Sequence, residues 1–105
     1  MPRFLFSCRV PRDYQPGAET GRVWEAWFGS LGGSRVDAGH GVIATRALGT
    51  LDDQTRLGGY SVVTAEDIDG AATLATGCSA LQFGGGVEIG AVPEVTGNPR
   101  AGTDA

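Results

Sequence analysis

The chain has 105 residues, 41% of them hydrophobic and 19% charged, which is the composition of one globular domain and not of a disordered chain. Twelve acidic and eight basic residues give a net charge of −4, which argues against general binding to nucleic acid or to an anionic membrane surface. No run approaches the about 18 apolar residues that a membrane span needs, and the N-terminus has too short an apolar core for a signal peptide, so we expect a cytoplasmic protein.

The N-terminal third predicts a strand, a turn and a helix. Residues 3–10 alternate as in a half-buried strand that Pro11 ends, and one side of it carries Phe4, Phe6, Cys8 and Val10. Two prolines and a glycine in residues 11–19 predict a turn. We expect a helix with Thr20 as its N-cap, ending at about Leu31 before two glycines. Its apolar face holds Val23, Trp24, Trp27, Phe28 and Leu31.

The middle of the chain predicts a second strand and a polar connection. Residues 34–38 alternate as a strand, and residues 42–45 are expected to continue it after a bulge or bend. His40 lies between them, flanked by Gly39 and Gly41. Residues 46–56 are expected to form a polar connection to the next strand.

Residues 57–92 have the clearest pattern, which predicts a strand, a helix, a glycine turn and a last strand. Tyr60 and Val62 share one side of the first strand, and Val63 lies on the other. Thr64 is expected to be the N-cap of the helix, and Gly77 lies near its end. The apolar face of this helix contains Ile68, Ala71, Ala72, Leu74, Ala75 and Cys78. After the glycine turn, Val87, Ile89 and Ala91 alternate as a half-buried strand.

The resulting order, β-α-β-β-α-β, predicts a ferredoxin-like α+β fold: a four-stranded antiparallel sheet with two helices on one face. The other face is open, and Val63 with Leu5 or Phe4 is expected to contribute to it, so a homodimer is the natural way to cover it. Residues 1–92 are expected to form this single domain. Residues 93–105, rich in Pro, Gly and small polar side chains, are expected to be a flexible tail.

Several segments resemble the YCII-related family, in particular its DGPF-type branch. They are LGGY at 57–60, GCSAL at 77–81, GGVEI at 85–89, the run with Trp24, Trp27 and Phe28, and VDAG at 36–39. The resemblance covers roughly residues 3–92 and implies a ferredoxin-like fold that assembles as a dimeric α+β barrel.

Most members of that family are uncharacterised, and a few are linked to cofactor-free chemistry such as dehydrochlorination of chlorinated aromatics. Some are proposed to use a histidine–aspartate pair, with the histidine near the start of the first helix. Here residues 13–22 contain no histidine, whereas Asp37 matches the position of the aspartate. The DGPF tetrapeptide is also absent, and its region reads LGTLDDQT.

His40 is the only histidine and therefore the natural candidate for a general base near neutral pH. Asp37 is three residues away, and a bend at Gly39 would bring the two side chains together as a catalytic dyad. The alternative is a solvated loop histidine without a catalytic role.

Other chemistry-bearing residues have simpler interpretations. Asp52 and Asp53 lack a matching His or Cys cluster, so we interpret them as a solvated turn and expect no metal and no cofactor. The glycines at 84–86 lead into a strand and do not indicate a nucleotide site. Arg35 and Arg46 either hold an anionic ligand or are surface charges. Cys8 and Cys78 are interpreted as buried free thiols, with a structural disulfide as the alternative.

Three hypotheses for function follow. The first is a small-molecule-binding homodimer whose pocket, between sheet and helices, is lined by Trp24, Trp27, Phe28 and Tyr60, with Asp37 and His40 at its mouth. The second is a cofactor-independent enzyme for proton transfer or elimination on an aromatic substrate, with His40 as base and Asp37 orienting it. The third is a dimeric scaffold or regulatory protein without a ligand, in which the aromatic face of the first helix is core packing.

Overall fold

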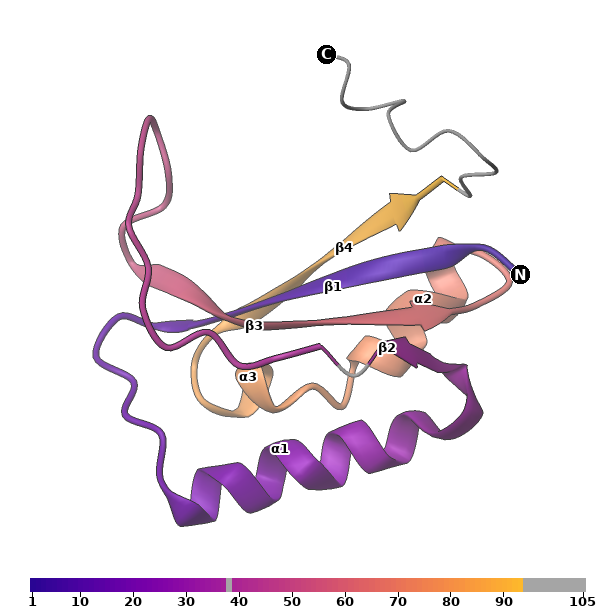
Figure 1. Cartoon of the computed structure of the whole chain (residues 1–105), viewed down its shortest axis with the longest axis horizontal. Coiled ribbons are helices and arrows are strands. Elements are labelled where there is room, and N and C mark those ends of the chain that lie inside the picture. Colours follow the sequence, from indigo (N-terminus) through magenta and orange to yellow (C-terminus); the bar gives the residue numbers. More distant parts are fainter. Residues whose placement is uncertain (38, 94–105) are drawn as a thin grey trace.

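The computed structural model describes residues 1–37 and 39–93, which form a four-stranded sheet with helices on one face (Figure 1). The elements in chain order are β1 (Arg3–Pro11), α1 (Ala18–Leu31), β2 (Arg35–Asp37), β3 (Thr55–Thr64), α2 (Ile68–Ala75), α3 (Ser79–Gln82) and β4 (Gly86–Val92). A short 3₁₀ turn, Gly32–Ser34, joins α1 to β2. In this part of the chain, no helix is long and apolar enough to span a membrane.

The strand order is β2-β3-β1-β4, and each neighbouring pair is antiparallel. β1 and β2 run in the same direction with β3 between them, as do β3 and β4 with β1 between them, so helical crossovers make both connections. This confirms the predicted α+β class and antiparallel sheet, and it is compatible with the predicted ferredoxin-like fold. The short α3 was not expected. Apart from Pro93, the tail predicted for residues 93–105 lies outside the described residues.

The hydrophobic core lies between β1 and the helices. All four residues predicted to face one side of β1 are at most 3% exposed, which confirms the alternation read from the sequence. Trp27 of α1 packs over the middle of this row, with its ring centroid 6.0 Å from that of Phe6. The other core side chains are Leu31, Val63, Ala65, Ala71, Ala75, Cys78 and Ala80. Burial of these apolar side chains is the main force that holds α1 and α2 on the sheet.

The predicted N-cap of α1 is wrong. The helix begins at Ala18, with Gly17 as the N-cap, and therefore starts before Thr20. The Thr20 hydroxyl accepts a hydrogen bond from the Gly17 N–H at 2.7 Å, so Thr20 stabilises the same helix start from inside the first turn. The predicted end at Leu31 is confirmed, because Gly32 follows with φ of 54°, a conformation that favours glycine.

The predicted N-cap of α2 is also wrong. Asp67 caps this helix, and its side chain accepts a hydrogen bond from the Gly70 N–H at 2.8 Å. Thr64 instead pairs with Arg3 as the last residue of β3, and its hydroxyl donates to the Ser34 carbonyl at 3.4 Å. Because strand pairing continues to Thr64, its backbone belongs to the sheet and the helix starts after it.

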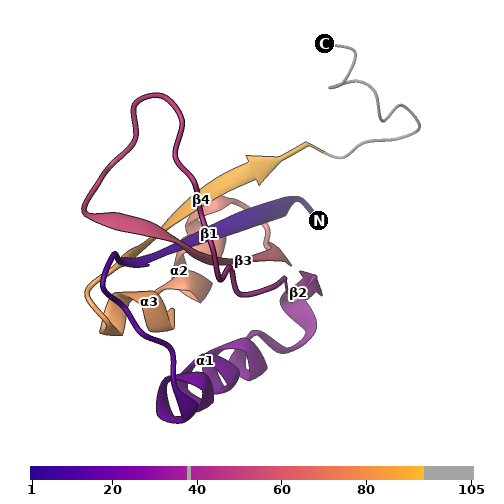
Figure 2. The same cartoon turned by 60° about the vertical axis from the view of Figure 1, so that its left-hand side comes forward.

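The connection between β2 and β3 differs from the prediction. Residues 42–45 do not continue β2; only an isolated bridge joins Gly41 to Gly59. The predicted strand position of Ala38 lies outside the described residues. Gly39 has a φ of 74° and turns the chain out of β2, which is the physical reason that the strand ends. The segment then rises from the sheet on the side away from the helices (Figure 2).

The two faces of the sheet differ in what covers them. Val63 was predicted on the open face, but it is fully buried on the helix face, opposite Phe4 in the register. The prediction is wrong because the parity of β3 places Ser61 and Val63 inward. The open face carries Leu5, Tyr60 and Val62, all of which are half-buried.

Candidate functional site

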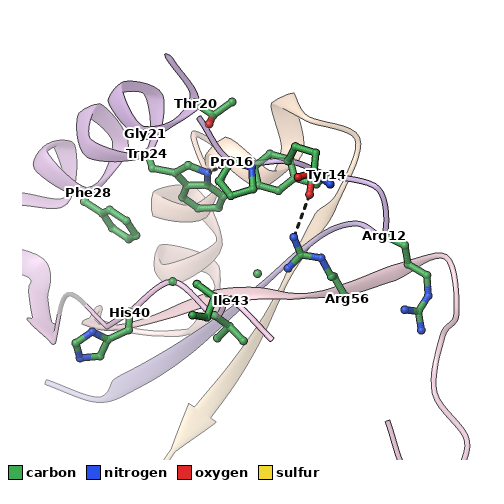
Figure 3. Close-up of a pocket in the computed structure, with 15 residues that line it drawn as sticks. Arg12, Tyr14, Pro16, Thr20, Gly21, Trp24, Phe28, His40, Ile43 and Arg56 are labelled. Carbon is green, nitrogen blue, oxygen red and sulfur yellow. Dashed lines mark hydrogen bonds between the residues drawn. The ribbon is translucent and has the colours of Figure 1, made fainter. Parts of the chain in front are cut away.

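A pocket of about 500 Å³ lies beside the core, between α1, the turn that precedes it, the beginning of β3 and residues 40–43 (Figure 3). Among the described residues, its lining consists of Arg12, Tyr14, Gln15, Pro16, Thr20, Gly21, Trp24, Phe28, His40, Gly41, Val42, Ile43, Arg56, Gly58 and Gly59. This volume is in the range of small-molecule sites in proteins. Of the residues expected to line a pocket or its mouth, Trp24, Phe28 and His40 are part of this lining, and Trp27, Tyr60 and Asp37 are not.

One wall of the pocket is aromatic. Trp24 and Phe28 of α1 are half-buried, and their ring centroids are 5.9 Å apart. The Trp24 indole Nε1–H donates a hydrogen bond to the Tyr14 hydroxyl at 2.9 Å, so the turn before α1 is tied to the helix. Trp27, predicted to line the pocket, belongs to the core instead: it is 5% exposed and donates its Nε1–H to the Leu74 carbonyl at 3.2 Å.

The opposite wall is formed by β3 and the segment that follows Gly39. The Tyr60 N–H donates to the His40 carbonyl at 3.1 Å, and the Val42 N–H donates to the Gly58 carbonyl at 3.0 Å. A Cβ atom on Gly59 would lie 3.1 Å from the His40 carbonyl oxygen, so the missing side chain lets the two backbones approach. Gly58 and Gly59 of the LGGY sequence therefore have a structural role as part of the pocket wall.

Two arginines complete the lining, and sequence reasoning did not single out either of them. Arg56 is half-buried on β3; its Nη2 donates to the Tyr14 carbonyl at 3.1 Å, and its guanidinium carbon lies 6.0 Å from the Tyr14 ring centroid. Arg12 is exposed and donates its Nε–H to the Asp53 carbonyl at 2.7 Å. Arg56 lies opposite the inward Val10 only because the register of β3 against β1 shifts between Cys8 and Arg9, and the alternation of β3 in the sequence does not reveal this.

In the structure, Asp37 and His40 do not form the proposed dyad. The Asp37 carboxylate accepts a hydrogen bond from the Gly39 N–H at 2.8 Å, within its own turn. Among the described residues, no hydrogen bond or ion pair links Asp37 to His40. The His40 ring is exposed and lies 6.1 Å from the ring of Tyr60. Figure 3 shows the imidazole at the end of the pocket away from Arg56, pointing outward. The catalytic role of the pair stays a prediction.

Tyr60, predicted as a ligand-binding residue, is not part of the pocket lining. It pairs with Ser7 on β1 and is directed to the open face of the sheet. Its neighbours on that face are Leu5 and Val62. This position makes Tyr60 a candidate for contact with whatever covers the open face, and not with a ligand of the pocket.

The adjacent acids have the turn role expected of them. Asp52 accepts hydrogen bonds from the Thr55 hydroxyl at 2.6 Å and from the Gln54 N–H at 2.8 Å. These two bonds, the first of them above all, hold the pKa of the Asp52 carboxyl below its usual value because they stabilise the charged form. In residues 1–37 and 39–93, no group of three His, Cys, Asp or Glu side chains is arranged to hold a metal ion.

Cys8 and Cys78 are brought together from β1 and the start of α3. Both are free thiols, both are buried, and their sulfur atoms are 3.8 Å apart. The hydrogen bond between them and burial raise the pKa of Cys8, whereas the same bond lowers the pKa of Cys78 to about 7. Cys78 is therefore the first of the two to ionise. The preferred interpretation as buried free thiols matches this arrangement.

Comparison with known proteins does not identify the chain. No protein-family profile matches it, and no curated protein is significantly similar to it. The assignment of function therefore depends on the geometry of the pocket and on the residues that line it.

Proposed function

We propose that the protein is a small-molecule-binding homodimer of the YCII-related type. The observation that carries the binding part is the pocket of about 500 Å³ with Tyr14, Trp24 and Phe28 on one side. Half-buried aromatic side chains around a concave space are typical of ligand sites. A scaffold without a ligand has no use for such a space beside its core, where close packing is the rule.

Binding is favoured over catalysis by the arrangement of the candidate base. General-base catalysis requires the imidazole to reach the substrate. In the proposed pair, the carboxylate must also hold the imidazole in the right orientation. The Asp37 carboxylate is engaged with its own backbone at Gly39, and the His40 ring lies against Tyr60. In neither contact does the Asp37 carboxylate orient the His40 imidazole, so we propose that the pocket binds a ligand and does not catalyse a reaction.

The indole N–H signals of the two tryptophans test this proposal. We expect millimolar 2-naphthol, 2-naphthamide or 2-naphthoate to shift the ¹H–¹⁵N resonance of Trp24, because its Nε1–H lies at the pocket wall, bonded to Tyr14. The resonance of Trp27 is the internal control, because its Nε1–H is bonded to Leu74 in the core. A Trp24 signal that none of the three compounds moves, or a uniform change at both tryptophans, contradicts a binding pocket.

The homodimer is supported by apolar surface on one side of the molecule. The open face of the sheet carries Leu5, Tyr60 and Val62, and the connection between β2 and β3 exposes Leu48 by 83% and Leu51 by 60%. This connection rises on the same side of the sheet (Figure 2). Apolar side chains gathered in this way are characteristic of protein–protein interfaces. A second copy related by a two-fold axis would cover the face with the same residues.

Val62→Arg is expected to convert the dimer to a monomer. The added guanidinium would be desolvated in the middle of the open face, and the weakening should be about tenfold or more in the dimer dissociation constant. Sedimentation velocity at micromolar concentration measures the change. Ile68→Arg is the matched control, because Ile68 is a 50% exposed apolar residue on α2, on the other side of the sheet. A wild-type chain that sediments as a monomer contradicts the dimer.

A further inference from the structure

The charge of the pocket lining indicates what kind of ligand it accepts. Arg12 and Arg56 both line the pocket, and no acidic side chain among the described residues does. This is opposite in sign to the whole chain, whose net charge is −4. Guanidinium groups in a partly enclosed space attract an anion more strongly than the same groups on an open surface, because solvent screens them less.

Arg56 has hydrogen-bond donors left for such an anion. One Nη2–H is used by the Tyr14 carbonyl, and within the described residues the guanidinium has no other hydrogen bond and no ion pair. An arginine side chain presents five N–H donors in a planar fork, so a pair of parallel donors remains. A carboxylate accepts from such a pair with both oxygens, which is the strongest common pairing of this kind.

The rest of the lining selects the body of the ligand. Trp24 and Phe28 form the wall that faces Arg56 across the pocket, and Ile43 and Val42 add aliphatic surface beside them (Figure 3). The Tyr14 hydroxyl accepts from Trp24, and its own proton has no acceptor among the described residues, so it is a further donor at the pocket wall. Flat apolar walls with donors at one end fit a planar ring that carries an acidic group.

We propose that the pocket binds an aromatic carboxylate whose carboxylate group is held by Arg56. This proposal rests on the proposed binding function and makes it specific. Arg56 is then the residue that decides between an anionic ligand and a neutral ligand of the same shape. The aromatic wall contributes affinity to both ligands, because ring packing does not depend on the charge of the substituent.

The wild-type protein alone provides the first test. We expect 2-naphthoate to bind about 10- to 100-fold more tightly than 2-naphthamide, which has the same shape without the charge, as measured by the Trp24 indole shift or by calorimetry. Equal affinity for the two overturns the proposal but leaves a binding pocket. If neither of these compounds nor 2-naphthol binds, the proposed function fails as well, so the two failures are distinguishable.

Three variants locate the effect. Arg56→Gln is expected to bring the ratio of the two affinities close to one, because it weakens naphthoate binding much more than naphthamide binding. Arg56→Lys, which keeps the charge but loses the planar fork, is expected to give an intermediate ratio. Arg22→Gln is the matched control, because Arg22 is an exposed arginine of α1 outside this pocket. If Arg22→Gln lowers the ratio as much as Arg56→Gln, net charge and not Arg56 is responsible, and the proposal is wrong.

Discussion

Replacing Gly85 with alanine is expected to destabilise the protein severely. A Cβ atom at this position would overlap the carbonyl oxygen of Arg9 and lie 2.8 Å from its carbonyl carbon. Both atoms belong to the backbone of β1, an inner strand paired on both sides, so neither can move aside without disturbing the sheet. We expect a loss of at least about 3 kcal/mol in the free energy of unfolding, a large share of the total of a small domain.

The neighbouring glycine is the control for this prediction. Gly86 has nothing within 4 Å of the position that its Cβ would take, although it pairs with Arg9 as the first residue of β4. Gly86→Ala is therefore expected to change stability by less than about 1 kcal/mol. Thermal unfolding followed by circular dichroism should place Gly85→Ala about 12 °C or more below the wild type. Equal melting temperatures for the two variants contradict the assigned approach of Gly85 to β1.

This contrast explains what the glycine turn is for. From the sequence, residues 84–86 resemble a phosphate-binding loop only in composition, and no nucleotide site was predicted there. In the structure, Gly84 has a φ of 88°, and Gly85 lies against the backbone of β1. Gly84 is required by its backbone conformation and Gly85 by its close approach to β1, whereas Gly86 has room for a side chain. Composition alone cannot separate these roles, because they depend on what β1 places opposite each residue.

The strands and the core were predictable because their pattern is local. The alternation of β1 and the apolar face of α1 follow from residues that are two, three or four apart, and tertiary packing reinforces both. The start of each helix was not predictable in the same way. Thr64 and Asp67 are both good N-cap residues, and only the pairing of Thr64 with Arg3 decides that Asp67 is used.

The lining of the pocket was predictable only in part. Trp24 and Phe28 were identified from the helical pattern, but the same pattern included Trp27, which packs against Phe6. Arg56 was missed because its position depends on the register of β3 against β1, which shifts between Cys8 and Arg9. A register shift of this kind changes which side chains face the helices, and no local pattern in β3 reveals it.

Gly39→Ala is expected to abolish binding in the pocket while leaving most of the fold intact. Gly39 has a φ of 74°, and a Cβ atom there would overlap the carbonyl oxygen of Tyr60 on β3. Relief of this overlap moves the segment that follows away from β3. That segment supplies His40, Val42 and Ile43 to the pocket wall, and none of these three residues belongs to the hydrophobic core.

Amide hydrogen exchange and ligand affinity should both report the movement of this segment. Exchange reports it because the movement breaks two backbone hydrogen bonds. These join the Tyr60 N–H to the His40 carbonyl and the Val42 N–H to the Gly58 carbonyl. In Gly39→Ala, both amides should exchange faster with solvent, and the affinity for 2-naphthoate should fall about tenfold or more. Gly41→Ala is the control, because a Cβ atom on Gly41 would meet only the Gly58 carbonyl oxygen, at 3.9 Å. If Gly39→Ala kept both the slow exchange and the affinity, the segment would not be the wall of the site. If exchange accelerated while affinity held, the ligand would lie elsewhere in the molecule.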